Sequence, residues 1–206
     1  QIEADWMLQA ERWATVMQGV SKTAGDAAGA VDGVKDGKYA FHTGREPNPW
    51  WQVDLGQCQA ILRSVVFNRL DNAPGLHNAD RLHVLTSDDG ENWTLSYENS
   101  GTHFGGVSGA PPLDVRFPNS VNARYVRLQI PSAAPVFFHL DEVEIFGQDD
   151  RDKNFGLRCR DDQSSLSHWY TNNVIVDVAE GLPSYITQIA HQGRILEADL
   201  ASRGVD

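Results

Sequence analysis

Stretches in which apolar and polar residues alternate follow one another along the middle of the chain. Each has the length of a strand, and together they occupy 61–70, 80–87, 92–98, 113–118, 123–130 and 140–147. In the fifth stretch, Val126, Leu128 and Ile130 take one face and the residues between them take the other. Short strands separated by turn signals, without helices between them, predict an all-β sandwich or barrel.

A helical period replaces this alternation near both ends of the chain. Within residues 3–19, apolar residues recur at steps of four, three and four from Trp6 to Met17, which predicts an amphipathic packing helix. A similar apolar face follows Pro183 in residues 182–204, and proline suits the first turn of a helix. The sequence therefore predicts helical segments flanking the sandwich on its N- and C-terminal sides.

These patterns divide the chain into three parts. The expected division is an N-terminal helix (1–22), a β-sandwich (23–148) and a C-terminal extension with a strand-like segment and a helix (149–206). Within the extension, residues 154–169 resemble the opening strand of such a sandwich. They either begin a further domain or supply the missing first strand from the C-terminal side, since the ends of such domains lie close together.

Composition narrows the possible partners. The chain has 206 residues and a formal net charge of −11, which argues against nucleic acid or an anionic membrane surface as the main partner. No apolar run approaches the roughly 18 residues of a membrane span, so no membrane insertion is expected. The two cysteines, Cys58 and Cys159, are too few for a disulfide framework, and whether they pair is left open.

One stretch concentrates residues that suit a binding site. His42 and a charged loop lead into the adjacent Trp50 and Trp51, which open an alternating strand. Because neighbouring residues in a strand point to opposite faces, one of the two tryptophans is expected in the core.

Six motifs, taken in order, resemble the discoidin or coagulation factor 5/8 type C family. They are AVDGVKDGKY, NPWWQVDLG, VVFNRLD, LTSDDGENW, ARYVRLQIP and FHLDEVEIFG. The resemblance implies a discoidin-type jelly-roll β-sandwich of the galactose-binding-like kind. NPWWQVDLG is most similar to the F-type, fucose-binding, lectin-like carbohydrate-binding modules. The resemblance therefore implies a non-catalytic module that recognises a glycan or polysaccharide, of fucose or galactose type.

The resemblance also assigns candidate sugar ligands. His42 stands six residues before the Asn of Asn-Pro-Trp-Trp, where F-type lectins carry a histidine. Arg69 and Asp71 match the Arg-x-Asp that follows in those lectins. A second basic residue is expected a short distance later, but that position is Leu76, so the chain departs from the pattern there.

The longer loop that follows offers replacements for this missing basic residue. His77, Asn78 and Arg81 lie within it, and Phe104 lies in a glycine-rich loop further along. A sugar presents hydroxyls to planar donors and C–H groups to an aromatic face, so Phe104 is a candidate stacking residue or else a plug at the sandwich end.

A structural calcium ion is the cofactor that the resemblance implies. Calcium takes six to eight oxygen ligands, many of them main-chain carbonyls. The expected ligands are Gly29, Asp32, Val34, Thr43, Asp141 and Glu142. Gly37 stands where the family supplies a hydroxyl, and Thr43 is the expected substitute.

No catalytic motif accompanies these residues, so the chain is interpreted as non-catalytic, although its parent protein could be a carbohydrate-active enzyme. The alternative function is a protein-interaction or adhesion domain of the same fold that binds no sugar. A lipid-binding domain of this fold needs basic residues around exposed apolar ones, which the acidic balance disfavours. The expected location is secreted, periplasmic or at the cell surface, with further domains of the same chain as possible partners.

Overall fold

The computed structural model describes residues 22–148 and 150–170, which belong to one compact unit. The helices predicted at 3–19 and 182–204 lie outside the described residues. The described elements are α2 (Lys22–Ala27), η1 (Ala28–Val31), β1 (Phe41–His42), β2 (Trp50–Phe67), η2 (Ala73–Gly75), β3 (His83–Ser87), β4 (Thr94–Glu98), β5 (Leu113–Gln129), β6 (His139–Leu140), β7 (Glu142–Gly147) and β8 (Arg160–Gln163). This composition confirms the predicted all-β class.

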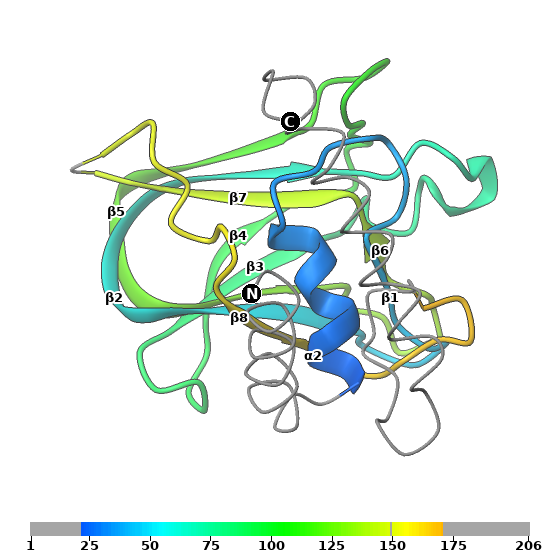
Figure 1. Cartoon of the computed structure of the whole chain (residues 1–206), viewed down its shortest axis with the longest axis horizontal. Helices are drawn as coiled ribbons and strands as arrows, with labels where there is room; N and C mark the ends of the chain where they lie inside the picture. Colours follow the sequence, from blue (N-terminus) through cyan, green and yellow to red (C-terminus); the bar gives the residue numbers. More distant parts are fainter. Residues whose placement is uncertain (1–21, 149, 171–206) are drawn as a thin grey trace, which may run out of the picture. The chain divides into compact units, whose positions relative to one another are not determined.

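Two long antiparallel strands organise the sandwich. The main sheet runs β4-β3-β5-β2-β7, with β8 also paired to β2, and β1 pairs separately with β6. β2 and β5 stay paired from Trp50 opposite Gln129 to Val66 opposite Leu113. They curve together at the left of Figure 1, so each strand contributes to both layers.

Irregularities in the pairing allow these strands to bend. The register of β2 shifts after Asp54, where Gly56 adopts φ +80°, a backbone conformation that glycine tolerates. The sequence predicted two strands at 113–118 and 123–130, but they form the single strand β5. Pro118 lies in the interval where the register of β5 shifts, and a bulge tolerates its missing N–H group.

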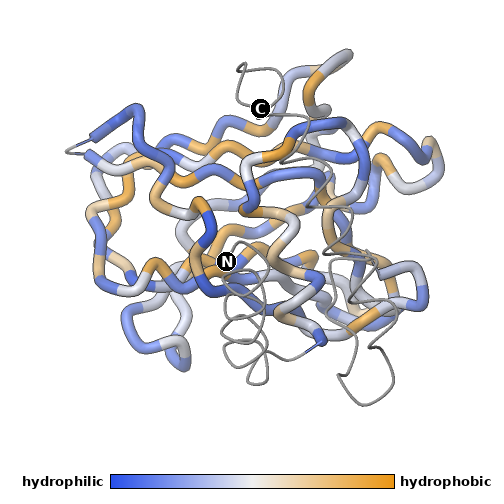
Figure 2. The backbone as a smooth tube through the Cα atoms, in the orientation of Figure 1, coloured by the Kyte–Doolittle hydropathy of each residue, from blue (hydrophilic) through white to orange (hydrophobic). Residues whose placement is uncertain are grey.

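The core fills the space between the layers, and apolar positions alternate with polar ones along the long strands (Figure 2). Trp51 is fully buried, packs 6.2 Å from the ring of Phe41, and donates a hydrogen bond from Nε1 to the carbonyl of Ala27 at 3.0 Å. Trp50 is half-buried, with the guanidinium of Arg127 over its ring at 4.3 Å. The prediction that one tryptophan of the pair enters the core is confirmed.

The segment after β7 returns to the sandwich. Asn154 bridges to Phe146 of β7, and β8 pairs antiparallel with the first residues of β2, from Trp51 opposite Gln163 to Asp54 opposite Arg160. Of the two alternatives left open for this segment, the structure shows the second, in which it supplies a strand. The sandwich therefore extends past the predicted boundary at residue 148.

Both cysteines are free thiols, Cys58 exposed and Cys159 half-buried, so they do not pair with each other. Among the described residues, no helix has the length and apolar character needed to cross a membrane.

Candidate functional site

The small sheet formed by β1 and β6 brings two histidines together. His42 and His139 are partners in its register, and their ring centroids lie 5.0 Å apart. The rings of Tyr39 and Phe137 contact His42 edge-on at 5.4 and 5.3 Å. The backbone N–H of His42 donates to Oδ2 of the buried Asp26 at 2.8 Å, which ties β1 to helix α2.

His42 presents an acceptor nitrogen to its surroundings. Its Nδ1 lies 2.9 Å from the carbonyl of Thr43, and because a carbonyl only accepts, Nδ1 carries the proton. Burial lowers the pKa of His42, and the nearby charge of Arg69 lowers it further, so the ring is neutral. Within the described residues Nε2 has no hydrogen-bond partner, and it is not sealed from solvent. It is therefore a free acceptor in a side chain that is only 5% exposed.

Arg69 presents donors beside this acceptor. Its Nε donates to Oδ1 of Asp71 at 2.5 Å, and its guanidinium lies over the ring of Tyr39 at 4.4 Å. Asp71 and Tyr39 therefore fix the orientation of the planar group. The two terminal nitrogens have no hydrogen-bond partner among residues 22–148 and 150–170, although the side chain is only 5% exposed. They can donate to a ligand hydroxyl or carboxylate in a fixed fork geometry.

His139 forms the floor of the cluster. Burial, together with the charge of Arg69, lowers its pKa to about 3, so it stays neutral. Asn78 donates from Nδ2 to the carbonyl of Phe137 at 3.2 Å and lies 3.3 Å from Nε2 of His139. The loop approaches so closely that a Cβ at Gly75 would lie 2.9 Å from that Nε2. Loop 72–82 thus closes one side of the cluster.

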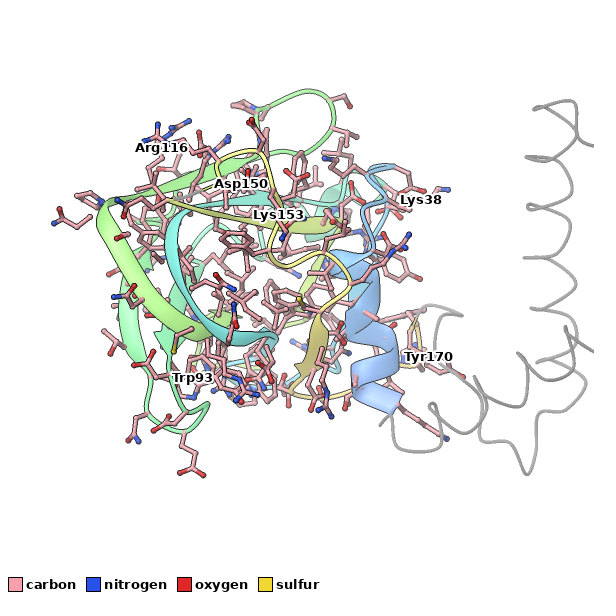
Figure 3. The ribbon with its side chains drawn as sticks, turned by 60° about the vertical axis from the view of Figure 1, so that its left-hand side comes forward. Lys38, Trp93, Arg116, Asp150, Lys153 and Tyr170 are labelled. Atoms are coloured by element: carbon pink, nitrogen blue, oxygen red, sulfur yellow. The ribbon has the colours of Figure 1, made fainter. Side chains whose placement is uncertain are left out.

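Trp169 forms an apolar wall at the mouth of the cluster. Its ring lies 5.6 Å from that of His42 and 5.5 Å from that of Phe137, yet the residue is 48% exposed. The backbone N–H of Ser167 donates to the carbonyl of His42 at 3.1 Å, which holds this segment in place. Figure 3 shows the neighbouring Tyr170 on the opposite side of the sandwich from Arg116.

The structure brings together three of the residues that the sequence named as candidate sugar ligands, His42, Arg69 and Asp71. The sequence did not single out His139 or Trp169. His139 can be recognised as part of the cluster only from the pairing of β1 with β6. Trp169 can be recognised only from the position of the segment after β7.

Three predicted sugar ligands lie elsewhere. His77 is exposed and pairs with Asp80, while Arg81 is exposed and contacts neither His42 nor Arg69 among the residues described. Phe104 is 3% exposed and packs in the hydrophobic core, which corrects its assignment as a stacking residue. The reason is the tight loop after it, where a Cβ at Gly105 would meet the carbonyl oxygen of Ala110 at 2.1 Å.

Two of the expected calcium ligands, Asp32 and Glu142, lie in a second polar region, where β7 meets the turn after η1. Glu142 is fully buried, and its Oε1 accepts from the N–H of Gly33 at 3.1 Å. Its Oε2 is buried without a hydrogen-bond partner among the described residues. Burial, reinforced by the charge of Asp32, raises the pKa of Glu142 to about 9. A buried carboxylate oxygen without a partner, near a second carboxylate, fits a bound cation.

The other expected calcium ligands differ in their availability. The carboxylate of Asp141 accepts from the N–H groups of Asp36 and Gly37 at 3.4 and 2.9 Å, which leaves its main-chain carbonyl for an ion. The hydroxyl of Thr43 is engaged elsewhere, since it donates to the carbonyl of Gly44 at 3.0 Å and accepts from the N–H of Phe138 at 2.9 Å. The structure therefore does not bring Thr43 to this region.

The turn that carries Asp32 is shaped by Gly29, Gly33 and Val34. At Gly29 a Cβ would lie 2.2 Å from the carbonyl oxygen of Ala40, so only glycine fits there. Gly33 adopts φ +87°, which places its N–H toward Glu142. Val34 is exposed, and its N–H donates to Oδ1 of Asp32 at 2.7 Å. These contacts fix Asp32 and the turn next to Glu142.

The antiparallel sandwich, in which β2 and β5 curve from one layer into the other, defines a galactose-binding-like domain. The chain belongs to the F5/8 type C domain family, whose model matches residues 13–143.

Individual relatives of this family are lectins and carbohydrate-binding modules. The chain is 27% identical over 126 residues to fucolectin-1 of Anguilla japonica, covering 56% of this chain and 65% of the fucolectin. It is 31% identical to the lectin domain of lectinolysin complexed with Lewis b antigen, with a TM-score of 0.47, covering 60% of this chain and 86% of that domain. A Streptococcus pneumoniae fucose-binding module is 27% identical, with a TM-score of 0.45, covering 60% and 84% of the two chains.

Proposed function

We propose that the domain is a non-catalytic carbohydrate-binding module that recognises a fucose- or galactose-type glycan at the His42–Arg69 cluster. The observation that carries the proposal is the pairing of a free acceptor, Nε2 of His42, with the free terminal donors of Arg69. Both belong to side chains whose remaining polar atoms are already satisfied by protein groups.

This arrangement matches the chemistry of a sugar. A hydroxyl can donate to Nε2 of His42, and a neighbouring hydroxyl can accept from Arg69, so a vicinal pair satisfies both groups at once. The half-exposed ring of Trp169 beside His42 offers an apolar face to the C–H side of the same sugar. Because most of the cluster is held rigidly before binding, little conformational freedom is lost when a ligand enters.

The family and its relatives support this reading. The relatives are named as a fucolectin, a lectin domain in complex with Lewis b antigen and a fucose-binding module, all of them sugar-binding proteins. The proposal includes a structural calcium ion at Glu142 and Asp32, and a place outside the cytoplasm next to other domains of the same chain. No catalytic role is part of it.

A glycan array probed with the calcium-loaded protein tests the proposal. Binding is expected to fucosylated or galactosylated glycans, with loss of the signal when free L-fucose or D-galactose competes. An array on which no glycan is bound would overturn the proposal and favour the protein-interaction alternative, which needs no sugar.

Replacing Trp169 by alanine is expected to weaken glycan binding by about 10-fold, since loss of an aromatic face removes roughly 1.4 kcal/mol. Calorimetric titration with the glycan selected on the array measures the change. Tyr170→Ala is the matched control, because it removes the adjacent exposed aromatic residue and should leave the affinity unchanged. If Trp169→Ala instead tightened binding, the ring would be a cover over His42 and not part of the ligand's surroundings.

A further inference from the structure

A second cluster of polar side chains lies outside the sugar and calcium regions. Nδ1 of His77 is 2.7 Å from Oδ2 of Asp80, and Nδ1 of His103 is 3.0 Å from Oδ1 of the same carboxylate. The two imidazole rings lie 4.5 Å apart between centroids. One candidate ligand atom from each of the three residues falls within 4.8 Å of the other two.

The two loops that carry these residues are held by one buried side chain. Asn99 is 3% exposed, and its Nδ2 donates to the carbonyls of Asp80 at 2.9 Å and Thr102 at 2.7 Å. Its backbone N–H donates to the carbonyl of Leu82 at 2.8 Å. Asn99 therefore fixes the backbone of Asp80 and of the residue before His103, independently of the three side chains themselves.

The core anchors the same loop from its other side. Phe104 directly follows His103 and is buried in the hydrophobic core, while its carbonyl accepts from Nδ2 of Asn68 at 3.2 Å. His103 is thus the solvent-facing neighbour of an anchored residue. A site whose backbone is fixed before a ligand arrives loses less entropy on binding.

The ligand type indicates which ion would bind. Two imidazole nitrogens with one carboxylate suit zinc and related divalent transition metals, whereas calcium and magnesium prefer oxygen ligands alone. Two ligands of one zinc ion lie at most about 4 Å apart, twice a bond length of roughly 2.0–2.1 Å. Side-chain rotations that move the ligand atoms by less than about 1 Å would bring them within this distance of one another.

We propose that His77, Asp80 and His103 form a binding site for a divalent transition-metal ion, with zinc as its representative. Each neutral imidazole carries its proton on Nε2 and offers Nδ1 to the ion, the carboxylate supplies the third ligand, and water completes a tetrahedral set. The ion joins loop 72–82 to loop 99–106. The proposal does not rest on the proposed sugar binding, because the site shares no side chain with the His42–Arg69 cluster.

The site has a consequence for the neighbouring loop. Asn78, directly after His77, contacts the carbonyl of Phe137 and lies 3.3 Å from Nε2 of His139. Zinc therefore fixes the loop that closes one side of the His42–Arg69 cluster.

Calorimetric titration of the calcium-loaded protein with zinc chloride, in the absence of any sugar, tests this proposal. One equivalent of zinc is expected to bind. Loss of a residue that only hydrogen-bonds to a metal ligand lowers metal affinity by roughly 10- to 100-fold. Because His77 and His103 would contact the ion directly, His77→Ala or His103→Ala is expected to lower the affinity by more than this. His83→Ala is the matched control, since this half-buried histidine also faces a carboxylate, that of Glu98 at 3.8 Å, but should leave zinc binding unchanged.

Cobalt(II) gives a second readout. The wild-type protein loaded with cobalt is expected to show the intense visible absorption of a tetrahedral site, and neither His77→Ala nor His103→Ala should show it. Failure of zinc to bind, or equal binding by all three histidine variants, would overturn the proposal. The glycan array is read separately, so a failed metal site does not count against sugar binding.

Discussion

Replacing Arg69 by methionine is expected to lower glycan affinity by at least about 100-fold, because hydrogen bonds to a charged group contribute roughly 1.5–3 kcal/mol each and 1.4 kcal/mol is tenfold. Methionine keeps an unbranched side chain over Tyr39 but has no donor. Calorimetric titration with the glycan selected on the array measures the loss.

Arg63 offers a control with similar contacts on a more exposed side chain, 35% exposed against 5% for Arg69. Its Nε donates to Oδ1 of Asp114 at 2.6 Å and its guanidinium lies over the ring of Phe146 at 5.4 Å, so it repeats the local contacts of Arg69. It shares Asp114 with Arg116, which Figure 3 places far from Tyr170. Arg63→Met should therefore bind glycan as the wild type does. Equal losses of glycan affinity in the two variants would show that the substitution acts by destabilising the folded domain. Unchanged glycan binding by Arg69→Met would contradict the assigned site.

Calcium is expected to raise the melting temperature of the protein, and to raise it more at pH 8 than at pH 6. Bound calcium stabilises the folded state by mass action. The ion competes with the proton that Glu142 holds in the metal-free protein, where the pKa of this carboxyl is about 9. Differential scanning calorimetry with excess calcium or EDTA at both pH values measures the difference.

The sign of the pH dependence follows from the direction of this shift. The pKa of Glu142 is raised from 4.5 to about 9 in the folded protein, so between these values the folded state binds a proton that the unfolded chain has released. The free energy of unfolding in EDTA should therefore fall as pH rises through this window, by up to about 1.4 kcal/mol per unit. Calcium should remove this slope, because it replaces the proton.

The variant Glu142→Gln separates the effect of this carboxyl group on stability from the effects of the other carboxylates. The amide keeps the size of the side chain without its charge, so the variant should lose most of the calcium response and the pH slope in EDTA between about pH 7 and pH 9, above the pKa of about 7 of Asp161. Glu144→Gln removes a charge from the same strand, where Glu144 pairs with Lys35 at 2.5 Å, and should keep the calcium response. A wild-type melting temperature that EDTA does not change would contradict a calcium site here.

The sequence predicted the fold well wherever the structure follows from local alternation of apolar and polar residues. The strand pattern and the burial of one tryptophan depend on local spacing, and both are found in the structure. The fusion of two predicted strands into β5 was missed because a bulge around Pro118 depends on how β2 pairs opposite it.

The candidate site was predictable only in part, for a related reason. His42 and Arg69 stand within recognisable motifs, but His139 lies opposite His42 only through the β1–β6 register, and Trp169 reaches it only because β8 pairs with β2. Of the two roles left open for Phe104, stacking on a ligand or plugging the sandwich end, its burial in the core excludes the first, because close backbone contacts in the loop turn the ring inward.

The most direct test of the sugar site is the side-chain nitrogen spectrum of the histidines during titration of the calcium-loaded protein with L-fucose or D-galactose. The account predicts that Nε2 of His42 starts as an unprotonated acceptor and shifts saturably as the sugar binds, while the nitrogens of His83 stay unchanged. Sugar binding that leaves the His42 signals in place would contradict the account.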